Sequence, residues 1–315
     1  MKWTPKGVTL PDVPLRVSRS IPLLLMLLHC GCTGRAVSLT ADREVPLRTV
    51  EFSGHRYVVR ADVGLAETVP IMIHGNAAMF LMLTHRPGER LNGGPVRKTE
   101  DYGYSSKGRG TLRLARMRLG GRTYSPIPPV PVFDFTENGD TLVQGMVGVR
   151  FLVAARAAVD FSRDRLLLGV VRGGPDRRLT GRGYRWARFS VGPGDRVTLP
   201  VRFPAIGRIL LITPSTVSNA LTLHRPLFAG RVPMSKTPSP DSSPNRTTPD
   251  QFVAEGVDFE IAGARMRSAA SFEDFAEYAN VPERDLDTFG MLGYDWMKEH
   301  KAILDYANRV LYFKP

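Results

Sequence analysis

The sequence predicts an all-β fold made of two similar lobes with few short helices. Two observations carry this prediction: most apolar segments have the length and spacing of strands, and several sequence blocks recur in the same order in both halves of the chain. Length agrees, because 315 residues suffice for two domains that each bury a core without disulfides or metal. We therefore expect two β lobes.

The predicted strands are short apolar or alternating runs bounded by Gly, Pro, Asn or Asp. They are Thr49–Val63, Pro70–Leu83, Thr111–Leu119, Val143–Phe151, Arg165–Val171, Arg196–Phe203, Ile209–Ile212, Val257–Ile261 and Arg309–Phe313. Helical spacing is clearest over Phe272–Ala279 and Tyr294–His300. Many strands and few helices favour a sandwich or a barrel.

The first residues have the pattern of an export signal. Arg16 and Arg19 precede an apolar run over residues 21–28 that is too short to span a bilayer. This predicts a signal peptide over residues 1–32. We therefore expect an exported protein of the periplasm or cell envelope, or a secreted one.

A lipid anchor is an open alternative at the end of this signal. Gly31-Cys32 fits half of the rule for bacterial lipoproteins, in which the cysteine carries lipid and attaches the protein to a membrane, whereas His29 and Cys30 fit the other half poorly. Cys30 and Cys32 are the only cysteines of the chain. The exported body therefore has no disulfide and no cysteine nucleophile.

Charge and histidine spacing argue against several other classes of protein. The formal net charge is +13, but the Arg residues are scattered and no helix-turn-helix or zinc-finger pattern accompanies them, so nucleic-acid binding is disfavoured. The six histidines lack metal-site spacing, and no phosphate-binding or dinucleotide motif is present. We expect neither metal nor cofactor.

Internal repetition divides the chain into two copies. Gly148–Leu152 resembles Gly293–Met297, which begins 145 residues later, and Ala158–Phe161 matches Ile303–Tyr306 at the same shift. Two upstream blocks recur in the same order. They are Met117–Arg122 with Phe259–Ala264, and Val69–Ile73 with Leu199–Phe203.

These blocks predict lobes over residues 45–175 and 185–315. The Gly- and Arg-rich stretch 173–183 lies between them. Residues 236–250 are rich in Pro, Ser and Thr and cannot bury enough apolar surface to offset chain entropy. We expect this segment to be a disordered loop inserted in the second lobe.

The repeated unit resembles the lobe of retropepsin-like and pepsin-like aspartic peptidases. In that family an apolar strand enters an Asp-Thr-Gly turn, a later apolar strand ending in Gly crosses beside that turn, and an Asp-aromatic strand closes the lobe. The later element is Gly145–Gly148 in one copy and Gly290–Gly293 in the other, and the closing pairs are Asp160-Phe161 and Asp305-Tyr306. The resemblance implies two closed-barrel lobes with the functional cleft between them.

The catalytic turns depart from the family pattern. Leu210–Ser218 matches the turn of the second lobe, but Ile212 stands where Asp belongs and Pro214 where Gly belongs, with Thr213 retained and Ser215 following. In the first copy, the corresponding assignments are Leu83 for Asp, Thr84 for Thr and His85 for Gly. The resemblance implies that the retained Thr hydroxyls hold the two turns together and line the cleft.

The loss of both acids predicts an inactive homologue. Aspartic peptidases need two neighbouring carboxylates that share one proton and activate a water, and neither Leu83 nor Ile212 can titrate. We therefore expect a pseudopeptidase that binds a peptide or protein partner through its interlobe cleft.

Two alternatives to this hypothesis stay open. One is an active endopeptidase with a non-standard catalytic pair, with an imidazole base at His85 as a further possibility. The candidate acids nearest the motifs are Asp62, Asp134, Asp140, Asp160, Asp258 and Asp305. The other is a structural lipoprotein of the envelope.

Overall fold

The computed structural model describes residues 39–51, 54–94, 96, 108–133, 142–217, 220–237, 251–275 and 289–315. All of them belong to one compact unit, Val37–Pro315. The predicted signal peptide, including Cys32, lies outside the described residues, as do residues 238–250 of the predicted loop. Lys236 and Thr237, assigned to that loop, instead end strand β18, because they pair with Phe252 and Gln251.

The described elements of the first half are mostly short strands. They are β1 (Arg43–Pro46), β2 (Arg48–Glu51), β3 (His55–Asp62), β4 (Val69–Ile73), β5 (Leu81–Thr84), α1 (His85–Asn92), β6 (Gly108–Leu112), β7 (Met117–Leu119), β8 (Arg122–Tyr124), β9 (Val130–Phe133), β10 (Gly145–Val147), α2 (Val149–Ala154), β11 (Ala158–Asp160), β12 (Arg165–Leu168) and α3 (Arg177–Thr180).

The second half likewise consists mostly of strands with a few short helices. Its elements are β13 (Arg185–Arg188), β14 (Ser190–Val191), η1 (Pro193–Asp195), β15 (Val197–Phe203), η2 (Pro204–Ile206), β16 (Arg208–Pro214), β17 (Leu221–His224), α4 (Arg225–Phe228), β18 (Ser235–Thr237), β19 (Gln251–Ile261), β20 (Ala264–Glu273), β21 (Phe289–Leu292), α6 (Tyr294–Glu299), β22 (Ile303–Asp305) and β23 (Val310–Phe313). The predicted all-β class with few short helices is confirmed. No described helix is long and apolar enough to cross a membrane.

Each half contains the same three-strand crossing. In the first half, β10 lies between β4, which runs parallel to it, and β5, which runs antiparallel. In the second half, β21 lies in the same way between β16 and β17. The Gly-containing segments singled out in the sequence are the central strands of these two crossings.

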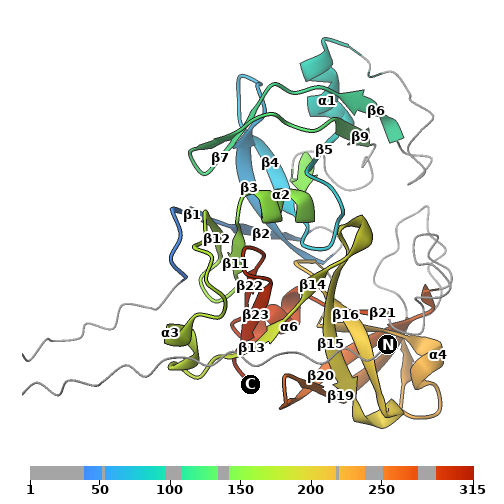
Figure 1. Ribbon diagram of the computed structural model, residues 1–315. Coiled ribbons are helices and arrows are strands. Elements are labelled where there is room, and N and C mark those ends of the chain that lie inside the picture. The colour runs from blue at the N-terminus through green and yellow to red at the C-terminus, as the bar shows by residue number, and fades with distance from the viewer. Residues whose placement is uncertain are drawn as a thin grey trace, which may run out of the picture. The chain divides into compact units, whose positions relative to one another are not determined.

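The two halves differ in how far their sheets close (Figure 1). In the second half a pairing of Arg202 with Glu260 joins β15 to β19 and closes a ring of strands, β15-β16-β21-β17-β20-β19. The described strands of the first half follow an open path, β6-β9-β5-β10-β4-β3-β7-β8. The predicted closed barrel is thus present in the second half, and the first half is a half-barrel.

A third sheet takes strands from both halves. Its order is β1-β12-β11-β22-β23-β13. At its centre β11 pairs antiparallel with β22, with Val159 opposite Leu304. These strands carry the repeated Asp-aromatic blocks, so the equivalent segments of the two copies pair with each other there.

Side chains also join the halves beside this sheet. The rings of Tyr57, Phe161 and Tyr294 form an aromatic cluster, with centroids 5.0 Å apart for Tyr57 and Tyr294. Lys298 Nζ donates to Asp164 Oδ1 at 2.7 Å and to the Phe161 carbonyl at 2.9 Å. Because Phe161 and Tyr57 are fully buried, the aromatic cluster belongs to the core.

The helix expected over Tyr294–His300 is confirmed as α6, whereas the one expected from Phe272 is wrong at its start. β20 continues through Glu273, since Phe272 and Glu273 pair with Leu223 and His224 of β17. Pairing to a neighbouring strand decided the conformation there against the local helical spacing.

Candidate functional site at the crossing turns

In each half, one turn follows the strand that runs parallel to the central strand of the crossing: residues 74–76 follow β4 and residues 215–217 follow β16. We call them the crossing turns. The His74 amide donates to the Val147 carbonyl at 2.9 Å, and the Ser215 amide donates to the Leu292 carbonyl at 2.8 Å. Val147 and Leu292 hold the same place in the repeated Gly-x-apolar-Gly segments. His74 and Ser215 are therefore equivalent positions of the two turns.

Thr216 links the two turns directly. Its Oγ1 accepts a hydrogen bond from the Gly75 amide at 2.8 Å and donates one to the Ile73 carbonyl at 2.6 Å. The side chain is fully buried, so both backbone groups would lack a partner without it. A single hydroxyl thus satisfies two backbone groups of the opposite half.

Gly75, the counterpart of Thr216, has no side chain to return this contact. The Tyr306 hydroxyl donates instead to the Gly75 carbonyl at 2.8 Å. A Cβ at position 75 would lie 2.3 Å from Tyr306 Oη and 2.9 Å from Thr216 Cγ2. Burial raises the pKa of Tyr306, which keeps the phenol protonated as a donor. Glycine is required because Tyr306 occupies the space of a side chain.

The central strands of the two crossings, β10 and β21, each need a glycine at one position. A Cβ at Gly145 would lie 2.5 Å from the Met82 carbonyl oxygen, and one at Gly290 would lie 2.4 Å from Ile212 Cδ1. Neither strand can pass between its neighbours with a larger residue. This close approach explains why the Gly-x-apolar-Gly segment occurs in both copies.

The side chains at the equivalent positions cannot form an acid pair. Burial, followed by the positive charge of Arg56, lowers the pKa of His74 to about 4, so the imidazole is neutral near pH 7. Ser215 Oγ donates to Asn76 Oδ1 at 3.3 Å and accepts from the Val217 amide at 3.1 Å. Neither turn contains Asp or Glu. The arrangement holds two turns together and offers no shared proton.

The predicted dyad positions, Leu83 and Ile212, are not equivalent in the structure. Leu83 lies on β5 opposite Gly145 in an antiparallel pair, whereas Ile212 lies on β16 opposite Gly290 in a parallel pair. Both side chains are fully buried in the hydrophobic core. The equivalence drawn between them is corrected by the strand register, which aligns Ile212 with Ile71.

The residues predicted beside the dyad are likewise dispersed. Thr84 Oγ1 donates to the Gln144 carbonyl at 3.3 Å within its own half, and His85 begins α1. Thr213 Oγ1 is buried with no hydrogen-bond partner among the described residues, and Pro214 ends β16. Neither threonine makes the bond between lobes that the resemblance implied; only Ser215, of the predicted set, lies in a crossing turn.

The alternative acids Asp160 and Asp305 cap their own turns. Asp160 accepts from the Ser162 amide and hydroxyl, and Asp305 accepts from the Asn308 amide at 3.1 Å and from Asn308 Nδ2 at 2.8 Å. Burial raises the pKa of both carboxyl groups, that of Asp305 to about 6. Both acids therefore stabilise the turns that follow their own strands. The described residues contain no cluster able to hold a metal ion.

Sequence reasoning missed His74, Gly75, Thr216 and Tyr306. The segment Ile73–Ala77 contains no Thr, so a search anchored on the Thr of the family turn passed over it. A usable signal was present in the second copy, where a second threonine, Thr216, follows Thr213 within the matched segment Leu210–Ser218. Only the pairing of β4 and β16 with the repeated Gly segments identifies the equivalent turns.

No protein-family model matches the chain, and no match was found among curated proteins. Solved structures resemble it in fold. An aspartic proteinase from Irpex lacteus has a TM-score of 0.50 at 12% identity, over 86% of this chain and 96% of that one. Basic 7S globulin from soybean has a TM-score of 0.46 at 11% identity, over 86% of this chain and 94% of that one. Conglutin gamma, a basic 7S globulin from lupine seeds, has a TM-score of 0.44 at 12% identity, over 86% of this chain and 95% of that one. The chain has the pepsin-like fold.

Proposed function

We propose that the chain is a non-catalytic protein of pepsin-like fold that binds a peptide or protein partner in the cleft between its two halves. One observation carries the proposal: the two crossing turns contain no carboxylate. They are His74-Gly75-Asn76 after β4 and Ser215-Thr216-Val217 after β16. Hydrolysis by this fold depends on two acids that share one proton. Leu83 and Ile212, the dyad positions predicted from the sequence, have no carboxylate either.

The hydrogen bonds of the turns support a retained scaffold. Thr216 still joins the two halves through two buried bonds, so the turns keep a fixed relation without the acids. An extended peptide can bind between such halves through backbone edges, which needs no catalytic group. We therefore favour binding over a purely structural role in the envelope.

An active peptidase with another acid pair is the second candidate. Asp160 and Asp305 are the buried acids with raised pKa, but Asp160 Oδ1 is bonded by Ser162 and both oxygens of Asp305 are bonded by Asn308. His74, neutral and with a pKa of about 4, is a poor base near pH 7. This candidate has no group placed to activate water.

The site of action we propose is the periplasm, the cell envelope or the exterior. The proposal depends on the export pattern of residues 1–32, and a lipid on Cys32 would attach the protein to a membrane. Mass spectrometry of the mature N-terminus distinguishes a diacylated Cys32 from a free N-terminus.

A binding assay tests the proposed function. Fluorescein-labelled unfolded casein is titrated with purified protein at pH 7 and pH 4, with anisotropy as the readout, and the bound casein is then recovered for mass spectrometry. We expect saturable binding with the casein intact. Absence of binding at both pH values overturns the binding role, and casein fragments overturn the non-catalytic role.

Two exposed alanines provide the matched variants for this assay. Ala78 follows the first crossing turn, whereas Ala205 lies in η2 of the second half. Ala78→Trp places a bulky ring beside the turns and is expected to weaken casein binding at least tenfold. Ala205→Trp is expected to leave it unchanged. Equal effects of the two substitutions would place casein binding elsewhere than at the crossing turns.

A further inference from the structure

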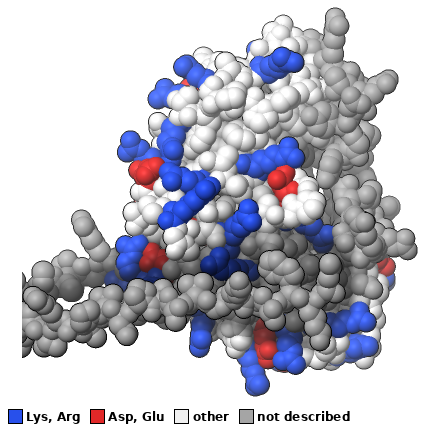
Figure 2. Space-filling view, viewed as in Figure 1, with Lys and Arg blue, Asp and Glu red and all other residues white. Residues whose placement is uncertain are grey.

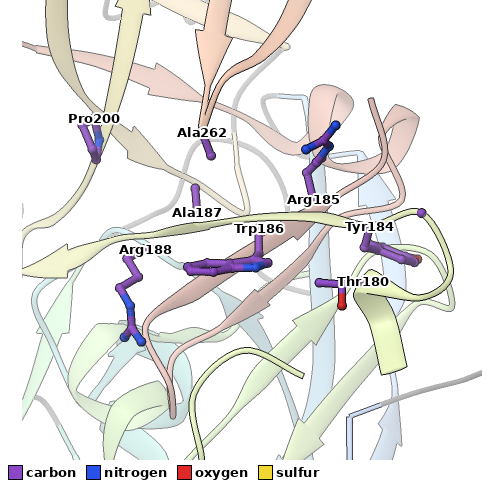
Figure 3. A pocket seen from close by; sticks show the side chains of 9 residues that line it. Thr180, Tyr184, Arg185, Trp186, Ala187, Arg188, Pro200 and Ala262 are labelled. Carbon is purple, nitrogen blue, oxygen red and sulfur yellow. The ribbon is translucent and has the colours of Figure 1, made fainter. Parts of the chain in front are cut away.

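A surface pocket of about 830 Å³ lies beside β13, away from the crossing-turn residues. It is bordered by β13 and the segment before it on one side, and by Pro200 of β15 and Ala262 of the β19–β20 turn on the other. In Figure 3, Ala187 and Ala262 point toward one another across this space. Its volume falls in the range of ordinary ligand sites.

β13 is the last strand of the six-stranded sheet, so one of its edges is unpaired among the described strands. On its other edge it pairs antiparallel with β23, and the Phe189 amide donates to the Arg309 carbonyl at 3.0 Å. Hydrogen-bonded positions alternate along an antiparallel pair. The amide and carbonyl groups of Trp186 and Arg188 therefore point to the open edge.

The side chains of this strand combine an exposed ring with two cations. Trp186 is 38% exposed, and Arg188 Cζ lies 5.9 Å from the centre of its ring. Arg185 and Arg188 are exposed, and neither forms an ion pair with any described residue. Ala187, between Trp186 and Arg188, is buried and lies on the other face of the strand. The edge thus presents open backbone groups, an aromatic surface and two positive charges.

The molecule as a whole carries an excess of positive charge. Figure 2 shows Lys and Arg distributed over the visible face with few acidic residues among them. The whole chain carries a formal charge of +13. Such a field attracts anionic partners and repels cationic ones.

We propose that β13 binds an acidic peptide segment of a partner protein, which adds to the sheet as an extra strand. The partner's backbone pairs with the outward amide and carbonyl groups of Trp186 and Arg188. On the face of these two side chains, a partner carboxylate lies against Arg188 and an apolar side chain lies on Trp186. The site uses none of the turn residues, so it stands independently of the proposed function.

Edge protection and lipid binding would use some of the same features, and experiment separates them from peptide binding. Charged residues on a sheet edge also prevent edge-to-edge aggregation, and in that case the arginines bind nothing. A Trp beside Arg also suits an anionic lipid surface. The peptide is favoured here because open backbone groups and a bordered pocket accompany the charges, which neither a lipid surface nor edge protection requires.

The test uses the fluorescein-labelled octapeptide Val-Val-Glu-Glu-Val-Val-Glu-Glu, which as a strand places Val and Glu in alternation on each face, with anisotropy as the readout. Wild type is expected to bind it saturably, and to bind the matched Val/Lys octapeptide at least tenfold more weakly. Arg185→Glu/Arg188→Glu is expected to weaken binding at least tenfold, and Trp186→Ala about fivefold. The control Arg113→Glu/Arg116→Glu makes the same charge change at exposed positions elsewhere and is expected to have less than a twofold effect.

A second probe tests strand addition itself. The same Val/Glu octapeptide, N-methylated at every residue, keeps its charge but loses the amide donors of both strand edges, and its affinity is expected to fall at least tenfold. Equal binding of this probe overturns strand addition. Equal loss in the two double-arginine variants overturns the site in favour of general charge attraction.

A vesicle-binding assay completes the test. Phosphatidylserine vesicles are sedimented with each variant. If vesicles bind wild type through Arg185 and Arg188 while the octapeptide does not bind, the surface is a lipid site and the proposal fails. Each variant is compared with wild type by circular dichroism, and Arg185→Gln/Arg188→Gln replaces the Glu pair if that variant fails to fold.

Discussion

The two crossing turns occupy equivalent places in the two halves but contribute differently to the junction between them. The second half supplies side chains: the hydroxyls of Ser215, Thr216 and Tyr306 all reach across. The first half supplies mainly backbone, through Ile73 and Gly75, with only the Asn76 side chain added. At the crossing turns, a repeat that is symmetric in its strands is therefore joined mainly by side chains of the second half.

The same contrast extends to the sheets. The second half closes its ring of strands through the pairing of β15 with β19, whereas the described strands of the first half remain open. The half with the closed ring also provides the three hydroxyls.

Gly75→Ala should produce the largest effect on this junction. The new Cβ would overlap Tyr306 Oη and Thr216 Cγ2 in the buried interior, which forces one of them to move. We expect a loss of about 3–4 kcal/mol in the free energy of unfolding, measured by urea denaturation. Gly173→Ala is the matched control because a Cβ there meets no atom within 4 Å. Equal stabilities of the two variants would contradict the close packing at position 75.

Thr216→Val sharpens the comparison by removing one hydroxyl. The Gly75 amide and the Ile73 carbonyl would both lose their partner while buried, at a cost of about 3 kcal/mol. Thr213→Val is the matched control three residues away, since its buried hydroxyl has no described partner. That variant should be unchanged or more stable by up to about 1 kcal/mol. A larger loss at Thr213 than at Thr216 would reverse our assignment of the linking residue.

The repeated acids give a smaller, pH-dependent effect. The pKa of Asp305 is about 6 in the folded protein, above its value near 4 in the unfolded chain, because burial disfavours the charged form. The folded state therefore binds more protons between these values, and stability falls as pH rises from 4 to 7. This fall should be about 2 kcal/mol smaller in Asp305→Asn than in wild type.

Urea denaturation at pH 4 and pH 7 measures this difference. Asp160→Asn, the counterpart in the first half, should change the fall in the same direction, because burial also raises the pKa of Asp160. A steeper fall in either variant would mean that these carboxyl groups are stabilised in their charged form.

The sequence predicted the fold through its repeats but not the residues of the junction. The Gly-x-apolar-Gly and Asp-aromatic blocks recur because the crossing strands need close approach and because β11 pairs with β22. The block Val69–Ile73 was matched to Leu199–Phe203, yet β4 takes the place of β16, not of β15. Apolar strands of similar composition do not reveal their partners.

The junction itself depends on contacts between distant residues. Tyr306 reaches Gly75 across 231 positions, and Thr216 reaches Gly75 across 141. Nothing in the local pattern marks Tyr306 as different from the Phe161 that precedes it in the repeat. The Thr-based match selected Thr213, whose hydroxyl has no described partner, because composition alone cannot tell it from Thr216.

Hydrolysis of casein tests the central claim most directly. Purified wild-type protein is incubated with unfolded casein from pH 3 to pH 8, with and without pepstatin, and new amino termini are counted. Because His74 and Ser215 replace the acids in the crossing turns, we predict no release above the protein-free control at any pH. Release that pepstatin abolishes would contradict the account, since it would require a working pair of carboxylates in this fold.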